Sequence, residues 1–210
     1  MPLRVSAISF LNPAPLLFHF EHEPTATALR SRYHVHYTSP ANCARELHAG
    51  TADLGLIPIA ELTPELAVVP GCTIASLHEV RSILLLVKNP DQLPPSEALS
   101  RIRSLAADTA SRSSIAYTRV LLERFHGIRP TFTEHPADPL AMLGLADAAL
   151  LIGDPAILAR EHRAEIDAAL QTASRTPLLW LDLATLWRQH TGLPWVAAVW
   201  AVRPQALAPA

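Results

Sequence analysis

Glycine and cysteine are both scarce in this sequence, and each scarcity excludes a class of protein. Only 7 of the 210 residues are glycine, and no two of them form a G-x-G arrangement. The dinucleotide-binding fingerprint and the phosphate-binding P-loop are therefore both absent. The two cysteines, Cys43 and Cys72, are too few for a disulfide framework and form no C-x-x-C pair. We interpret them as small apolar residues of a protein in a reducing compartment.

An excess of charge of one sign is also missing, as is a long apolar run. Nineteen acidic and seventeen basic residues leave a net charge of −2, which gives no electrostatic case for a nucleic acid partner. No stretch approaches the roughly 18 apolar residues of a membrane span. The N-terminal apolar stretch is interrupted by Asn12, Pro13 and Pro15, which is poor for a signal peptide. We expect a cytoplasmic protein without a membrane partner.

Strand and helix patterns alternate along the chain, which indicates an α/β fold with largely parallel sheets. The expected strands are Leu3–Phe10, Tyr33–Thr38, Asp53–Ile59, Thr73–Leu77, Ser82–Val87, Ile102–Ala107, Thr131–Glu134, Asp147–Gly153, Leu178–Leu181 and Trp195–Val202. The expected helices include Pro40–Gly50, Ser113–Phe125, Pro139–Leu145, Ala156–Leu170 and Asp182–His190.

The segment Asn89–Ser96 contains three prolines and is the best linker between two such series of elements. Two series joined by a linker indicate two lobes. The apolar runs Ser82–Val87 and Trp195–Val202 could pair as crossing strands that form a hinge between the lobes. We therefore predict a discontinuous first lobe, residues 1–88 and 195–210, with the second lobe, residues 89–194, inserted in it.

Familiar catalytic patterns are not found. Five of the ten histidines lie among the first 48 residues, but no H-E-x-x-H or H-x-x-E-H frame accompanies them. A metal site is therefore not predicted. A G-x-S-x-G nucleophile motif is absent, and neither cysteine has a recognisable activating context.

The most informative polar cluster is Ser111-Arg112-Ser113-Ser114, at the start of the strongest predicted helix. Hydroxyls together with the free backbone N–H groups of a helix start form an anion site, which the helix dipole favours. The alternative is an over-capped helix, although a single serine at the N-cap would suffice for capping.

Further polar residues follow two other predicted strands. Gly153 and Asp154 end one of them, and Ser9 and Asn12 end the first strand of the chain. In open α/β sheets, ligands bind outside the carboxyl ends of the strands, so these residues are candidates for a binding site. For Asn12 alone, a role in the turn is the competing interpretation.

Six further segments form a pattern in order and spacing, and they are Ser9–Leu16, Ala52–Pro58, Val80–Leu85, Asp108–Ala116, Asp147–Asp154, and Asp182-Leu183 leading to Thr191–Val196. Taken together, over about residues 4–203, they resemble the menaquinone-biosynthesis chorismate dehydratase family of the futalosine route. One departure is Ser113, where the family motif usually has threonine, a change that keeps the hydroxyl.

The resemblance implies a two-lobed periplasmic-binding-protein-like fold of the second type, with a hinge of two crossing strands. It also implies a hydro-lyase that converts chorismate to 3-[(1-carboxyvinyl)oxy]benzoate without cofactor or metal. Carried over by motif, Asn12 and Ser82 would hold the substrate from the first lobe. From the second lobe, Ser111, Ser113 and Ser114 would bind a carboxylate. Ser9, Arg112 and Gly153 complete the expected binding residues.

Asparagine and serine are poor general bases, so the proton lost in the reaction needs another acceptor. Asp154, a water molecule and the enolpyruvyl carboxylate of chorismate are the alternatives, and we favour the last. A non-catalytic carboxylate receptor, the sister dihydroxynaphthoate synthase and a ligand-sensing regulatory domain are rival readings of the same fold. The oligomeric state is left open.

Overall fold

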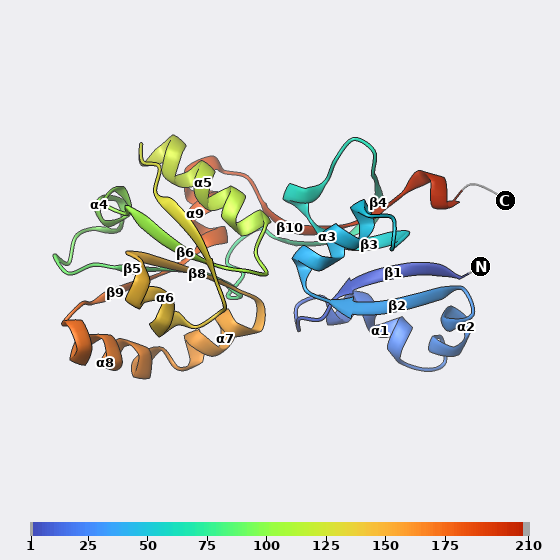
Figure 1. Cartoon of the computed structure of the whole chain (residues 1–210), viewed down its shortest axis with the longest axis horizontal. Helices are drawn as coiled ribbons and strands as arrows, with labels where there is room; N and C mark the ends of the chain where they lie inside the picture. Colours follow the sequence, from blue (N-terminus) through green and yellow to red (C-terminus); the bar gives the residue numbers. More distant parts are fainter. Residues whose placement is uncertain (1, 208–210) are drawn as a thin grey trace. The chain divides into compact units, whose positions relative to one another are not determined.

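The computed structural model describes residues 2–207, so residue 1 and residues 208–210 of the predicted first lobe lie outside the described residues. The chain divides into two compact units. Unit 1 comprises the residues up to Ala75 and those from Val196 onward, and unit 2 comprises Ser76–Trp195. Figure 1 shows one β-sheet with its own helices in each unit. The predicted α/β class is confirmed.

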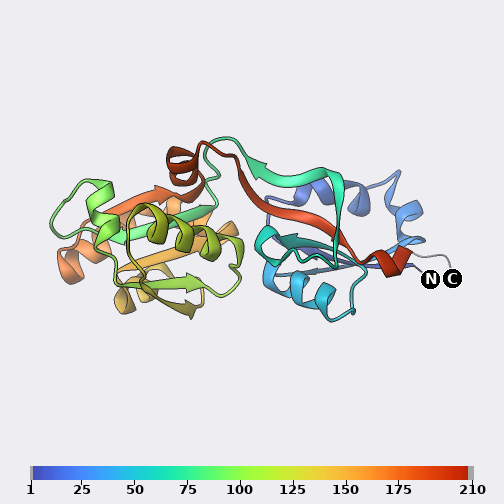
Figure 2. The ribbon, with the colours of Figure 1, turned by 90° about the horizontal axis from the view of Figure 1, so that it is seen from above.

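Unit 1 is built on a five-stranded sheet of order β2-β1-β3-β10-β4. Its strands are β1 (Leu3–Ile8), β2 (Tyr33–Thr38), β3 (Leu54–Pro58), β4 (Ala67–Ser76) and β10 (Trp195–Val202). Strand β1 pairs in parallel with both β2 and β3, whereas β10 pairs antiparallel with β3. Strand β4 runs beside β10 at the edge of the sheet (Figure 2). The sheet is therefore mixed, and parallel only over its first three strands.

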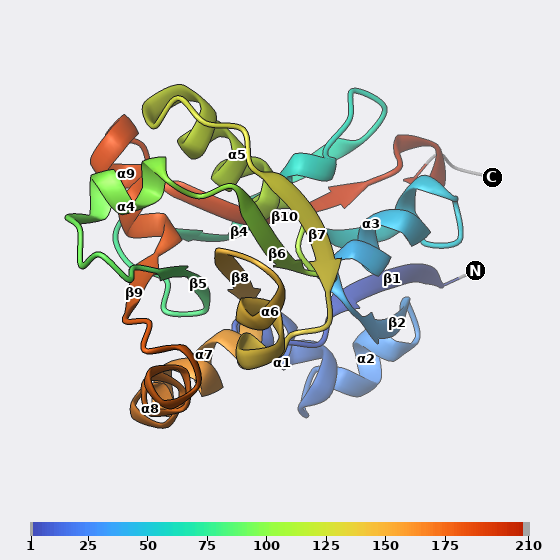
Figure 3. The ribbon, with the colours of Figure 1, turned by 60° about the vertical axis from the view of Figure 1, so that its left-hand side comes forward.

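Helices lie on both faces of the unit 1 sheet (Figure 3), and they are α1 (Ala14–Glu21), α2 (Ala26–Arg30) and α3 (Pro40–His48), with short 3-10 turns at Ile59–Glu61 and Pro204–Leu207. Helix α3 begins as its sequence predicts, because the Ser39 side chain accepts a hydrogen bond from the backbone N–H of Asn42. Its apolar face buries Cys43 and Leu47 against the sheet, so Cys43 is the core residue that we expected, although Cys72 is exposed.

Unit 2 has a second five-stranded sheet of order β7-β6-β8-β5-β9. Its strands are β5 (Ile83–Lys88), β6 (Ser104–Asp108), β7 (Thr131–His135), β8 (Ala148–Ile152) and β9 (Leu178–Asp182). Strands β7, β6 and β8 are parallel, and β5 is antiparallel to both of its neighbours, β8 and β9. The carboxyl ends of β6 and β8 therefore lie at the same edge of the sheet as the amino end of β5.

Two groups of helices cover the faces of this sheet (Figure 1). Together they comprise α4 (Pro95–Ser100), α5 (Ser113–Phe125), α6 (Pro139–Leu145), α7 (Gly153–Glu161), α8 (Arg163–Ser174) and α9 (Leu183–Thr191). Helix α5 packs against α9, and α8 packs against α6 and α7. The single helix predicted over Ala156–Leu170 is wrong, because the backbone leaves the helical region at His162 and separates α7 from α8.

The predicted pairing of Ser82–Val87 with Trp195–Val202 is also wrong. Strand β5 is buried along its length and pairs with β8 and β9 in unit 2. A strand that is apolar on both faces is stable between two other strands, and unit 2 provides both. The chain passes between the units at Ala75–Ser76 and Trp195–Val196, so the two crossing strands of the fold are β4 and β10.

The proline-rich segment is a closed turn inside unit 2 rather than a linker. Asn89 is buried, and its backbone N–H donates to the carbonyl of Pro177 at 2.8 Å. Its side chain both donates to the carbonyl of Leu93 and accepts from the backbone N–H of Leu93, each at 2.9 Å. The boundary expected at Asn89 therefore does not separate the two sheets, and we propose domain boundaries at the two chain crossings instead.

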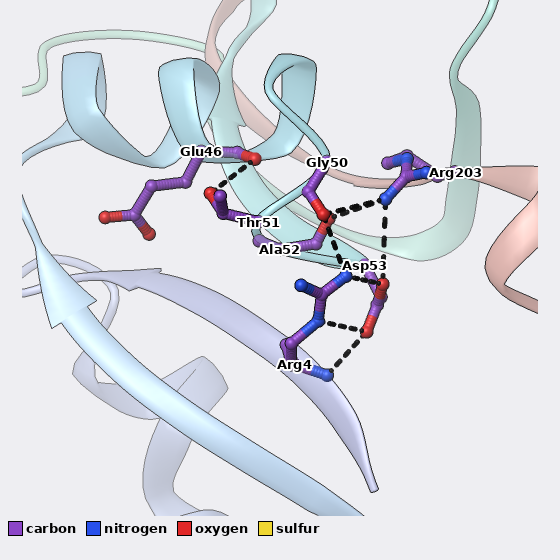
Figure 4. Close-up of polar contacts among 7 residues, drawn as sticks. All are labelled: Arg4, Glu46, Gly50, Thr51, Ala52, Asp53 and Arg203. Carbon is purple, nitrogen blue, oxygen red and sulfur yellow. Dashed lines mark hydrogen bonds and ion pairs between the residues drawn. The ribbon is translucent and has the colours of Figure 1, made fainter. Parts of the chain in front are cut away.

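An ion-pair network joins β1, β3 and the end of β10 within unit 1 (Figure 4). The carboxylate of Asp53 accepts hydrogen bonds from Nε and Nη2 of Arg4 at 3.0 and 2.6 Å. Arg203 donates to the carbonyl of Gly50 at 3.1 Å and lies 3.7 Å from Asp53. Hydrogen bonds from Arg4 and the charges of both arginines hold the pKa of Asp53 below its ordinary value, despite the opposing effect of burial.

Replacing Asp53 with Asn is expected to lower stability in a pH-dependent way. Because the folded pKa is depressed, the Asp53 carboxylate stabilises the fold above the unfolded pKa, and this contribution is lost as the pH falls through the folded pKa. Urea unfolding should show a lower midpoint for Asp53→Asn at pH 7, with the difference from the wild type narrowing toward pH 3. Asp91→Asn, which breaks an exposed pair with Arg101, serves as the control and should change little. Equal urea midpoints for Asp53→Asn and the wild type at pH 7 would contradict the stabilising role of the Asp53 carboxylate.

Candidate active site

Most of the predicted site residues lie in unit 2, where the carboxyl ends of β6 and β8 meet. The loop from β6 to α5 carries Ser111 and Arg112, and the first turn of α5 carries Ser113 and Ser114. Strand β8 runs parallel to β6 and leads directly into α7 at Gly153. The topology therefore brings two loops and two helix starts to one edge of the sheet, as expected for a ligand site in an open α/β sheet.

The amino end of α5 has no side-chain cap. Its N-cap residue is Arg112, at φ −131° and ψ −63°, and no side-chain hydrogen bond caps the helix. Ser113 and Ser114 follow as the first two helical residues and are each 5% exposed. Capping therefore does not explain this serine cluster, and the interpretation as an over-capped helix is wrong. The helix start combines buried hydroxyls with the positive end of a 13-residue helix dipole.

Ser111 is the most unusual member of the cluster. It is 1% exposed, and its hydroxyl oxygen finds no hydrogen-bond partner among the described residues. Its backbone N–H donates to the carbonyl of Asp108 at 2.9 Å. An unsatisfied buried hydroxyl costs about 1–3 kcal/mol. A buried hydroxyl without a partner, at the start of a helix that has no side-chain cap, is typical of a binding site. There a bound ligand supplies the missing hydrogen bond.

Arg112 is held toward the neighbouring edge strand. Its guanidinium donates to the carbonyl of Ser111 at 3.0 Å and to the carboxylate of Glu134, on β7, at 3.2 Å. Glu134 is the more exposed partner of this pair. Arg112 thus adds a positive charge beside the serines, while Glu134 fixes its direction.

Ser82 and Gly153 lie next to each other where β5 begins and its neighbour β8 ends. Ser82, 3% exposed, immediately precedes β5, and its carbonyl accepts a hydrogen bond from the backbone N–H of Gly153 at 2.7 Å. The prediction that Ser82 belongs to the first lobe is wrong, because Ser82 lies in unit 2. Gly153 has φ +63°, in the left-handed region where glycine is favoured, and this lets β8 turn sharply into α7. Asp154 follows half-buried in the first turn of α7.

Two predicted residues lie in unit 1, after the carboxyl end of β1. Ser9 is exposed, and both its backbone N–H and its hydroxyl donate to the carbonyl of Thr38, at 3.0 and 3.3 Å. Asn12 is exposed in the turn before α1. That turn is closed by a hydrogen bond from the backbone N–H of Ala14 to the carbonyl of Leu11 at 3.1 Å. The side chain of Asn12 is therefore carried by a fixed backbone.

Two aspartates that sequence reasoning did not single out organise the site in unit 2. Asp182 accepts hydrogen bonds from the backbone N–H groups of Val80 and Arg81 at 3.0 and 2.8 Å, and it also caps α9. Arg81 has φ +64°, so this carboxylate stabilises a strained backbone directly before Ser82. The only sequence signal for Asp182 is its position between a predicted strand and a predicted helix, and that position indicates an N-cap rather than a contact with Val80 and Arg81.

Asp108 is the second of these aspartates and closes the loop that carries Ser111. It is 4% exposed, and its Oδ1 accepts a hydrogen bond from the backbone N–H of Ala110 at 2.9 Å. Burial raises the pKa of Asp108, while backbone hydrogen bonds from Ala110 and Ile152 oppose that rise. Within residues 2–207, no group of three or more His, Cys, Asp or Glu side chains is placed to hold a metal ion.

Comparison with known proteins assigns the chain to a family. The model of a family described as menaquinone biosynthesis matches residues 3–210. This chain belongs to the menaquinone-biosynthesis family. A relative, the chorismate dehydratase of Thermus thermophilus, is 32% identical over 179 residues, which are 81% of this chain and 62% of that protein. The chain thus spans less than two thirds of the length of this relative.

Solved structures show the fold of this member of the family. A protein from Archaeoglobus fulgidus superposes with a TM-score of 0.63 at 15% identity, covering 96% of this chain and 68% of the other. The alkanesulfonate-binding protein SsuA from Xanthomonas axonopodis pv. citri gives 0.56 at 16% identity, covering 97% and 66%. The fold is therefore periplasmic-binding-protein-like of the second type, as predicted. In the described part of the chain, no helix is long and apolar enough to cross a membrane.

Proposed function

We propose that this member of the menaquinone-biosynthesis family is a hydro-lyase that dehydrates chorismate to 3-[(1-carboxyvinyl)oxy]benzoate. The observation that carries the proposal is the start of α5, with its buried serines, its lack of a side-chain cap and the unsatisfied hydroxyl of Ser111. It supports binding of an anionic group, and chorismate carries two carboxylates. The relative from Thermus thermophilus is named a chorismate dehydratase. We place the reaction in the cytoplasm.

The residues divide by chemical role. Hydroxyls of Ser111, Ser113 and Ser114, with the backbone N–H groups of the first turn of α5, bind one carboxylate of the substrate. Arg112 adds positive charge, held in place by Glu134. Within unit 2, Gly153 binds the substrate from the start of α7, and the Ser82 hydroxyl stabilises the charge that develops during the reaction. In unit 1, taken by itself, Ser9 and Asn12 stay predicted substrate-binding residues.

The reaction needs little more than positioning and proton transfer. A base removes the proton from the ring carbon that bears the enolpyruvyl ether. The electron pair of that C–H bond forms the new ring double bond, and the neighbouring hydroxyl leaves, taking up a proton to become water. Aromatisation of the ring drives the elimination, and no electrons enter or leave overall. In our proposal the enolpyruvyl carboxylate of chorismate is the base, and side-chain hydroxyls stabilise the developing charge.

Replacing Asp154 with Asn tests whether this side chain is the base instead. If the substrate supplies its own base, Asp154→Asn should keep kcat within about threefold of the wild type, because a general base typically contributes 100-fold or more. Steady-state rates at saturating chorismate measure this effect. A loss of 100-fold or more with unchanged circular dichroism would make Asp154 the base.

The proposed function is tested by incubating the purified chain with chorismate and following the ultraviolet absorbance of an aromatic product. Catalytic turnover supports the dehydratase proposal. Binding of chorismate in a calorimetric titration, without any absorbance change, would instead favour a non-catalytic carboxylate receptor. Absence of both would favour a different substrate, such as that of the sister dihydroxynaphthoate synthase.

A further inference from the structure

Asp108 connects the two loops that form the site in unit 2. It is the last residue of β6, and its carboxylate accepts a hydrogen bond from the backbone N–H of Ala110, one residue before Ser111. The backbone of Ile152, at the end of β8, also hydrogen-bonds to this carboxylate. One buried side chain therefore holds the β6–α5 loop beside the start of α7.

A charged acceptor in this position satisfies backbone donors that would otherwise stay buried without a partner. Hydrogen bonds to charged groups are stronger than those to neutral acceptors. The carbonyl of Asp108 adds a third constraint, because it accepts the backbone N–H of Ser111 at 2.9 Å. Asp108 thus fixes the backbone on both sides of Ala110, and with it the direction of the unsatisfied Ser111 hydroxyl.

Asp147 performs the same structural task at the opposite edge of the sheet. Its carboxylate accepts hydrogen bonds from the backbone N–H groups of Arg103 and Ser104 at 2.9 and 3.1 Å, which joins the amino end of β6 to that of β8. No predicted site residue lies at that edge. Both aspartates hold backbone N–H groups at strand ends, but Asp147 is one third exposed and also lies 3.8 Å from the guanidinium of Arg103, whereas Asp108 is buried beside the predicted site.

We propose that Asp108 is a positioning residue for substrate binding, acting through the Ser111 loop and the start of α7. This inference rests on the proposed function. A serine cluster that holds the substrate carboxylate equally in the ground state and in the transition state changes KM rather than kcat when it is displaced. Asp108 therefore governs how tightly the substrate is held and leaves the rate of the elimination step nearly unaltered.

The experiment compares Asp108→Asn with Asp147→Asn in the full chain. The Asp108→Asn amide presents a donor where the carboxylate accepts from the backbone, so the Ser111 loop shifts. We expect KM for chorismate to rise about 50-fold with kcat within about threefold, because the displaced serines lose hydrogen bonds to a charged carboxylate that are equally strong in the ground state and in the transition state. Asp147→Asn should lower the urea midpoint by less, because its carboxylate is one third exposed, and should leave both constants within about threefold. Proportional losses of activity and stability in both variants would reduce Asp108 to a structural residue and overturn the proposal.

Amide hydrogen exchange measures the mobility of the Ser111 loop directly and does not depend on turnover. In Asp108→Asn, exchange should accelerate at residues 110–114 and at the start of α7, whereas in Asp147→Asn it should accelerate at residues 103–104. An inactive wild type would count against the dehydratase function alone, because the exchange pattern still tests the positioning role. Unchanged exchange at residues 110–114 in Asp108→Asn would overturn that role.

Discussion

Replacing Ser114 with Asp is expected to lower kcat/KM for chorismate about 1,000-fold. The new carboxylate would stand in the first turn of α5, where the proposed site binds a substrate carboxylate. Two like charges 4 Å apart repel by about 4 kcal/mol at an effective dielectric constant of about 20, and each 1.36 kcal/mol is a factor of ten in rate. Steady-state kinetics measure the loss. Ser114→Ala, which removes one hydroxyl and adds no charge, should lose only about tenfold.

Ser96 provides a matched control for this charge. It occupies the second helical position of α4, as Ser114 does in α5, and its side chain is exposed. Ser96→Asp therefore introduces the same charge at the same position of another helix in unit 2, and it should leave kcat/KM within about twofold. Helix dipoles favour the aspartate in both places, so the contrast isolates the anion site. Equal activity of the two Asp variants, both folded, would show that no anion binds at α5.

The second large effect is expected at Ser82. Replacing Ser82 with Ala should lower kcat about 100-fold, as the loss of one hydrogen-bond donor to a developing charge typically does. The side chain is buried directly before β5, and its backbone is fixed by the hydrogen bond from Gly153 and by the contacts of Asp182 with the preceding residues. The alanine variant should therefore keep its fold, and the loss should appear in single-turnover rates rather than in chorismate affinity.

Ser104 is the corresponding control. It begins β6 at the opposite edge of the same sheet, where its hydroxyl oxygen accepts a hydrogen bond from the backbone N–H of Asp147 at 3.0 Å. Ser104→Ala should lower stability by about 1 kcal/mol and leave kcat within about twofold. If Ser82→Ala matched Ser104→Ala in both respects, the Ser82 hydroxyl would have no part in the reaction.

Local signals in the sequence predicted many elements well, because each is determined by neighbouring residues. Helices α5 and α6 begin and end at the predicted residues, and α3 starts at the predicted Pro40. The break at His162 was missed, since apolar periodicity continues through both α7 and α8. An apolar run such as β5 also looks the same in either sheet, because its hydrogen bonds rather than its composition decide its neighbours.

The candidate site shows the same division between local and long-range information. The serine cluster at α5 was predicted because hydroxyls at a helix start are visible in sequence. The role of Asp108 in holding the Ser111 loop could not be predicted, because it depends on a backbone contact with Ile152, more than forty positions away in the chain. Asp182 was missed for a similar reason, because its contacts with Val80 and Arg81 join residues that only the folded sheet brings together.

Proton NMR of chorismate mixed with a catalytic amount of the purified chain tests the dehydratase proposal most directly. We predict that the ring signals of chorismate are replaced by those of a 3-substituted benzoate, while the two vinyl protons of the enolpyruvyl group persist. The same spectra recorded with Ser114→Asp should change far more slowly. Unchanged chorismate signals in the presence of the wild type, or loss of the enolpyruvyl protons, would contradict the proposed reaction.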